Sequence, residues 1–154
     1  MRPIATARRL AVAAAIPLAA AACRAGPADP GAGLEPARAR WARSGPANYR
    51  MTLHRSCECT EAMSGPVVVT VRGGAVTARV YERTGAPVAA SYAGVFPVVE
   101  GLFALVEAGI RAGTRPADVR YHPALGYPTR LVFGDPATDA PVTAVTAVTA
   151  FRAE

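Results

Sequence analysis

A pair of adjacent glycines near the middle of the chain is the feature that most constrains its fold. Gly73 and Gly74 separate two runs rich in β-branched residues, 67–72 and 75–81. Glycine adopts positive φ without steric penalty, and a two-residue turn of this kind joins antiparallel strands. The sequence therefore predicts a β-hairpin here, and with it an antiparallel sheet.

The glycine turn also predicts the register of the hairpin. It pairs Val71 with Val76, and continuing this pairing gathers the small apolar residues of both strands on one face. Threonine and arginine side chains then fall on the other face. The further pairs predicted in this way are Val69 with Ala78 and Val67 with Val80.

The chain is long enough for one domain with a packed core. Its 154 residues are a typical length for a single domain. Because 51% of the residues are hydrophobic and only 18% are charged, the composition excludes a generically disordered chain.

Hydrophobic periodicity predicts two helices. Leu34, Ala37 and Trp41 recur at helical spacing in a short segment that ends at the Ser-Gly-Pro sequence of residues 44–46. A longer apolar stripe in residues 97–111 predicts an amphipathic helix that covers a sheet.

Several further strands are predicted around the hairpin. Alternating apolar and polar residues begin at Tyr49, residues 122–126 read as a hairpin loop between two strands, and residues 142–151 are rich in β-branched side chains. Together the elements predict an α+β fold. We expect an antiparallel β-sheet of about five to six strands, with one long and one short helix packed on one face.

The N-terminus has the layout of an export signal. Arg2, Arg8 and Arg9 precede an uncharged and mostly apolar stretch at 10–22. A membrane-spanning helix needs about 20 apolar residues. The shorter stretch predicts instead that residues 1–22 are a signal peptide.

Small residues at 20–22 lead directly into Cys23, an arrangement that resembles the lipobox of bacterial lipoproteins. We expect Cys23 to be lipidated and to hold the protein on the extracytoplasmic side of the cell membrane. Residues 23–33 are then the lipidated cysteine and a flexible tether, and residues 34–154 a single α+β domain. The alternative is cleavage after the alanines, which releases a secreted protein.

The charge pattern gives little support to nucleic-acid binding. The net charge of +6 includes the three arginines of the predicted signal, and no basic run with interleaved aromatic residues follows. The expected partners are the membrane, through the lipid anchor, and an unidentified protein or small molecule.

The domain contains a Cys-x-Cys pair, Cys57 and Cys59. In a regular strand their Cβ atoms would lie about 6.5 to 7 Å apart, so a disulfide requires a bend at Glu58. Arg55 would share the core side of that strand, which predicts that the strand ends before the cysteines. Four interpretations stay open: a structural disulfide, a soft-metal site for Cu or Zn with His54 as third ligand, a redox pair, and an intermolecular disulfide.

No catalytic pattern surrounds the two histidines, His54 and His122. The sequence contains no nucleophile elbow, zinc-protease motif, phosphate-binding loop or dinucleotide fingerprint. We therefore expect a protein that is not an enzyme and that holds no cofactor apart from the Cu or Zn considered above. His122 and Tyr127 are candidates for an exposed contact loop. The other aromatic residues considered, which we expect in the core, are Trp41, Tyr49, Phe103 and Tyr121.

A series of short motifs resembles a known family. It comprises Trp41, Asn48-Tyr49-Arg50, Ser56-Cys57-Glu58-Cys59, residues 66–71, Val99-Glu100-Gly101-Leu102-Phe103 and residues 121–128 with Gly126-Tyr127-Pro128. In this order the motifs resemble the small bacterial exported proteins and lipoproteins grouped as domain of unknown function 6174. The resemblance covers about residues 41–151 and implies an exported or lipid-anchored domain without an assigned activity.

Two functions are consistent with these features. The main expectation is an extracytoplasmic, lipid-anchored protein that binds a partner or another component of the cell envelope. The alternative is a thiol-redox or soft-metal-binding protein that acts through Cys57-Glu58-Cys59.

Overall fold

A computed structural model describes residues 31–113, 118–135 and 140–154. The predicted signal peptide, Cys23 and the predicted tether as far as residue 30 lie outside the described residues, so export and lipidation stay predictions. In the part of the chain that is described, no helix is long and apolar enough to cross a membrane.

The described chain contains helices and strands in mixed order. The helices are α1 (Leu34–Ser44), α2 (Glu61–Ser64) and α3 (Val99–Arg111), with a single 3-10 turn, η1 (Ala90–Tyr92). The strands are β1 (Tyr49–Cys57), β2 (Val67–Arg72), β3 (Ala75–Tyr81), β4 (Asp118–Tyr121), β5 (Pro128–Asp135) and β6 (Ala140–Ala153).

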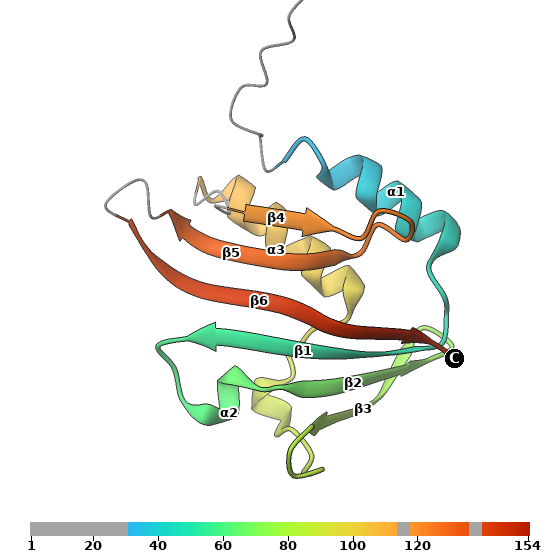
Figure 1. The fold of residues 1–154 in the computed structure, drawn as a ribbon, viewed down its shortest axis with the longest axis vertical. Coiled ribbons are helices and arrows are strands. Elements are labelled where there is room, and N and C mark those ends of the chain that lie inside the picture. The colour runs from blue at the N-terminus through green and yellow to red at the C-terminus, as the bar shows by residue number, and fades with distance from the viewer. Residues whose placement is uncertain (1–30, 114–117, 136–139) are drawn as a thin grey trace, which may run out of the picture.

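All six strands form one sheet in the order β3-β2-β1-β6-β5-β4, and every neighbouring pair is antiparallel. The first three strands and the last three each form a meander, and the central pair, β1 and β6, joins the two halves (Figure 1). The predicted α+β class and the predicted antiparallel sheet are confirmed.

The core lies between the sheet and α3. The predicted apolar stripe of this helix is buried, with Val99, Leu102, Phe103 and Val106 no more than 2% exposed. Each such side chain contributes about 1.5 to 3 kcal/mol through burial, which is why an amphipathic helix covers this face. The sheet residues buried in the same cluster include Met51, Leu53, Val67, Val69, Val71 and Leu131.

Helix α1 closes the same side of the sheet. Leu34, Ala37 and Trp41 are buried along it, in agreement with the predicted helical spacing. The four aromatic residues predicted to lie in the core do so: Trp41, Tyr49 and Phe103 are buried, and Tyr121 packs against the buried cluster.

The predicted glycine hairpin forms, but its register differs from the prediction beyond the first pair. Val71 pairs with Val76 as predicted, and a bulge then leaves Thr77 outside the ladder. The predicted pairs of Val69 with Ala78 and of Val67 with Val80 are therefore wrong. The observed partners are Arg79 for Val69 and Tyr81 for Val67.

Contacts with Phe96 account for the shifted register. The Nε–H of Arg79 donates a hydrogen bond to the backbone oxygen of Phe96 at 2.8 Å, and the Tyr81 ring lies edge-on to the Phe96 ring at 6.4 Å. Phe96 itself is 0% exposed. The bulge turns Arg79 and Tyr81 toward the core and moves Ala78 and Val80 to the other face, because burying the larger side chains gains more apolar area.

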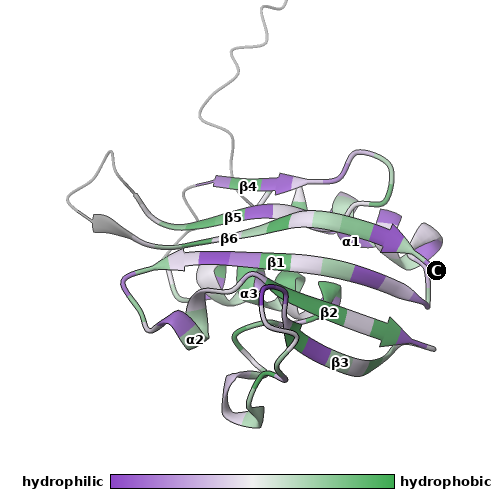
Figure 2. Ribbon diagram, turned by 60° about the horizontal axis from the view of Figure 1, so that its bottom comes forward, coloured by the Kyte–Doolittle hydropathy of each residue, from purple (hydrophilic) through white to green (hydrophobic). Residues whose placement is uncertain are grey.

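Among the described helices, none covers the second face of the sheet. In Figure 1, α3 lies behind the strands, and the face toward the viewer is uncovered. Hydrophilic and hydrophobic residues alternate along β1 in Figure 2, as expected for a strand with one face on a core and the other in solvent. We call this second surface the open face; its central residues are Arg50, Thr52, His54, Val68, Thr70, Val145, Ala147, Ala150 and Arg152.

Candidate functional site

The Cys-x-Cys motif forms a disulfide at the end of the central strand β1. Cys57 and Cys59 are bonded, with their Cα atoms 5.2 Å apart. This separation is shorter than two residues of extended strand and lies within the usual range for disulfides. The chain bends at Glu58 and Cys59, which confirms the predicted bend.

The prediction that β1 ends before the cysteines is wrong. The strand continues to Cys57, whose backbone pairs with Ala144 of β6. Arg55 is tolerated on the core side because it is only half-buried, near the end of the strand. The strand pairing therefore holds the first cysteine in place, and only the second leaves the sheet.

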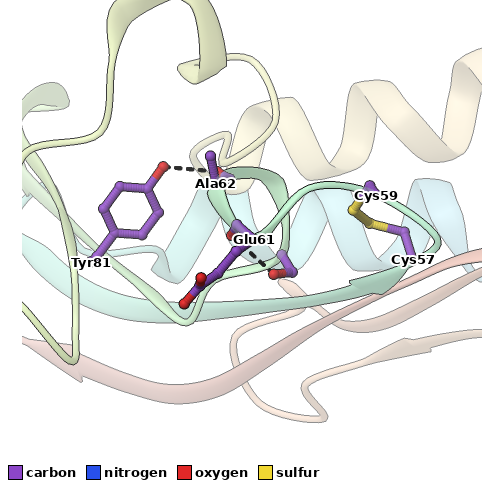
Figure 3. Close-up of a disulfide and its surroundings, with 6 residues drawn as sticks. Cys57, Cys59, Glu61, Ala62 and Tyr81 are labelled. Carbon is purple, nitrogen blue, oxygen red and sulfur yellow. Dashed lines mark hydrogen bonds between the residues drawn. A yellow bond between two sulfur atoms is a disulfide. The ribbon is translucent and has the colours of Figure 1, made fainter.

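The disulfide leads directly into α2, a one-turn helix that the sequence did not predict. Thr60 precedes this helix, and the Tyr81 hydroxyl donates a hydrogen bond to the backbone oxygen of Ala62 at 2.8 Å (Figure 3). Arg83 and Glu61 form an exposed ion pair beside it. Strand β3 and its turn thus hold the loop after the disulfide against the sheet.

A small hollow lies beside this loop. Its volume is about 220 Å³. The lining residues are Glu61, Ala62, Gly65, Pro66, Tyr81, Arg83 and Thr84. The two cysteines do not line it, so the disulfide and the hollow are neighbours rather than one site.

His54 does not join the cysteines. It pairs with Ala147 and is exposed on the open face, whereas Cys57 is three residues along the same strand and on the opposite side. Among the described residues, no three His, Cys, Asp or Glu side chains come together in a group that could hold a metal ion. The proposed Cu or Zn site with His54 as third ligand therefore finds no support in this geometry.

The predicted contact loop of His122 and Tyr127 is the turn between β4 and β5. Tyr127 is 6% exposed, so its predicted exposure is wrong. Its ring stacks on Phe151 at 4.4 Å and meets Trp41 edge-on at 6.2 Å, because burial against these rings gains more than a solvent contact. Burial raises the pKa of its phenol.

His122 is half-buried and holds the turn closed. Its ring stacks on Tyr127 at 4.8 Å, and its Nδ1 accepts a hydrogen bond from the backbone N–H of Leu125 at 3.1 Å. The backbone N–H of His122 donates to the oxygen of Tyr127 at 2.8 Å. These contacts show how the histidine shapes the turn, and its role as a partner contact stays a prediction.

The open face carries a second and larger hollow, of about 370 Å³, that the sequence did not reveal. It lies over β1, β2 and the end of β6. The outward alternation of Arg50 and Thr52 was visible in the sequence, but Arg152 joins them only through the long-range pairing of β1 with β6. The lining residues are Arg50, Met51, Thr52, Val68, Glu82, Ala150, Phe151 and Arg152.

A third hollow, of about 410 Å³, lies on the helix side between α1, α3 and the sheet. Trp41, Tyr49 and Phe103 line it together with Glu100. Burial raises the pKa of Tyr49 to about 12, and its hydroxyl accepts a hydrogen bond from the Val99 backbone N–H at 3.3 Å. The buried phenol, held by this hydrogen bond, acts as a fixed structural group.

Comparison with known proteins assigns the domain to a family. The family described as a family of unknown function (DUF6174) matches residues 33–149, from the start of α1 into β6. No curated protein and no solved structure matches the chain. Because the family match spans most of the chain and nearly all of the α+β domain, this protein belongs to the DUF6174 family.

Proposed function

We propose that this protein is an extracytoplasmic binding module, held at the membrane by a lipid on Cys23, that contacts its partner through the open face. The observation that carries the proposal is the uncovered sheet surface with a hollow of about 370 Å³. Helices α1 and α3 cover the other face, so the core does not require a second covering layer. Within the described residues, the open face is thus available to a partner.

The membrane part of the proposal rests on the sequence before the domain. Three arginines, an apolar stretch and small residues precede Cys23 in the order of a lipoprotein signal. The test is fractionation of cells that express the full chain or its Cys23→Ser variant, with metabolic labelling by a fatty-acid analogue. We expect a labelled, membrane-associated wild type and an unlabelled variant. An unlabelled wild type outside the membrane fraction would refute the anchor.

The binding part is tested by placing a photo-crosslinking amino acid on each side of the molecule. Ala150 is exposed in the hollow of the open face, and Ala104 is an equally small, exposed residue on α3. We expect a discrete adduct in intact cells from position 150 and none from position 104. The same pattern from both positions, or no adduct from position 150, would contradict binding through the open face.

A thiol-redox role is the second candidate, because the Cys57–Cys59 disulfide lies in a partly exposed turn. In this role a dithiol protein attacks one sulfur, the Cys57–Cys59 bond breaks, and a mixed disulfide forms. The second thiol of the partner then resolves it, which leaves two protein thiols and an oxidised partner.

Equilibration with glutathione buffers, followed by alkylation and intact-mass measurement, tests this role. If the role is redox, Cys57 and Cys59 interconvert between disulfide and dithiol while the protein stays folded, at glutathione ratios within the range of the buffers. A disulfide that persists until the protein unfolds is structural, and this result would exclude the redox role. A Cys57→Ser/Cys59→Ser variant that keeps the open-face crosslink separates the two candidate functions.

A further inference from the structure

Two arginines face each other across the central strand pair. Arg50 of β1 and Arg152 of β6 are directly opposed in the antiparallel register, so their side chains project side by side from the open face. Both residues are exposed. Like charges in directly opposed positions destabilise a sheet, and the core imposes no need for either guanidinium group.

The carboxylate of Glu154 pairs with Arg50 and with a third arginine of the open face, Arg72. The Oε2 atom of Glu154 is 2.5 Å from Nη2 of Arg72, and its Oε1 atom is 3.7 Å from Nε of Arg50. Within the described residues no carboxylate pairs with Arg152. The three arginines outnumber the two nearby carboxylates, Glu154 and Glu82, so the cluster keeps one surplus positive charge.

The arginine pair forms one end of the open-face hollow. Its volume of about 370 Å³ falls within the range of small-molecule sites, about 300 to 1,000 Å³. Val68 and Ala150 provide apolar lining. Thr52 and Glu82 supply polar groups, and the Thr52 hydroxyl donates a hydrogen bond to Oε1 of Glu82 at 3.4 Å.

We propose that this hollow binds a small organic anion, a carboxylate or a phosphate monoester, with its oxyanion between Arg50 and Arg152. The proposal rests on the proposed binding function and names its ligand class. A guanidinium group presents parallel N–H donors that match two oxygens of such an anion. The apolar part of the ligand lies on Val68 and Ala150, and Glu82 accepts a hydrogen bond from a donor group of the ligand.

Titration calorimetry of the purified full chain with three probes of one shape tests the proposal. The probes are benzoate, phenyl phosphate and neutral benzamide. We expect saturable one-to-one binding of at least one anion and none of benzamide. The anion that binds distinguishes a carboxylate ligand from a phosphate ligand, and binding of benzamide with the affinity of the anions would overturn the proposal.

Charge-matched variants locate the binding. Arg50→Gln and Arg152→Gln each remove one positive charge from the hollow, and we expect the dissociation constant to rise at least about tenfold. Arg111→Gln removes the same charge from the last turn of α3, on the other side of the sheet, and should leave binding unchanged. Equal weakening in all three variants would show a general effect of net charge and refute the site.

A further variant tests the hollow without changing any charge. Ala150→Trp fills it, and we expect loss of anion binding with an unchanged circular dichroism spectrum. If no anion binds the wild type, the ligand class is wrong. The proposed function is tested separately, by the crosslink from position 150. The two failures are therefore distinguishable.

Discussion

The indole Nε1–H of Trp41 donates a hydrogen bond to Oε1 of Glu100 at 2.8 Å, and this bond joins α1 to α3. The indole ring also lies edge-on to Tyr49, at 5.6 Å, and to Phe151, at 6.0 Å. Trp41 is 8% exposed. One side chain thus connects both helices to the two central strands.

Removal of this donor is expected to destabilise the domain. Trp41→Phe keeps an aromatic ring but leaves Glu100 without the indole, and we expect the free energy of unfolding to fall by about 2 to 4 kcal/mol. Glu100→Gln, which retains an acceptor oxygen, should cost less than about 1 kcal/mol. Urea unfolding followed by circular dichroism measures both, and equal losses would contradict a role for the bond itself.

Gly126 is expected to tolerate substitution poorly. Its φ is +84°, and a Cβ atom there would collide with the backbone oxygen of Ala37 and lie 2.9 Å from Cβ of Arg40, both on α1. Gly126→Ala should lower the free energy of unfolding by about 3 kcal/mol or more.

The matched control for this glycine is Gly74→Ala in the β2–β3 turn. Its φ of +77° is similar, but nothing lies within 4 Å of the added Cβ atom. We expect a loss of about 1 to 2 kcal/mol from backbone strain alone. Urea unfolding of the two variants side by side separates strain from collision, and equal losses would show that the contact with α1 is unimportant.

Loss of the disulfide is expected to have a modest effect on stability. The ring closed by Cys57 and Cys59 spans very few residues, so it removes little conformational entropy from the unfolded chain. The Cys57→Ser/Cys59→Ser variant should unfold with about 1 to 2 kcal/mol less free energy than wild type. Reduced wild type is the control, and a loss above about 4 kcal/mol would show that α2 depends on the bond.

Two tyrosines are expected to titrate late. Burial raises the pKa of Tyr49 and of Tyr121 to about 12 from 10.0, and in the unfolded chain both return to 10.0. Above pH 10 the unfolded state therefore binds fewer protons than the folded state, so stability falls as the pH rises. The contribution is fully present below pH 10 and is lost as the pH passes through about 12.

Ultraviolet difference absorbance over this alkaline range measures the shift. Tyr49→Phe and Tyr121→Phe should each remove one late-titrating phenol. A wild-type curve in which all tyrosines ionise together near pH 10 would contradict this prediction.

The elements whose structure is determined by residues close together in the sequence could be predicted from the sequence. The apolar stripe of α3 needs only its own periodicity, and Gly73 and Gly74 fix the first pair of their hairpin, Val71 with Val76. The pairs beyond it depend on Phe96, whose backbone oxygen and ring bind residues of β3. Because such contacts join distant parts of the chain, local alternation could not reveal the bulge.

The same reason limits prediction of the sites. The bend at Glu58 followed from strand dimensions and disulfide geometry, both of which are local. The burial of Tyr127 depends on its stacking with Phe151, and the opposition of Arg50 and Arg152 depends on how β1 meets β6. An irregularity between Thr52 and its neighbour shifts that pairing, and the sequence carries no local signal for it.

The position of β6 beside β1 has a consequence for the order of synthesis. Tyr49 finds its partner, Ala153, only after nearly the whole described chain has followed. During synthesis from the N-terminus, β1, β2 and β3 are complete before β6 exists. The edge of β1 that pairs with β6 therefore has no partner until the last strand is made, so completion of the six-stranded sheet depends on the last strand of the described chain.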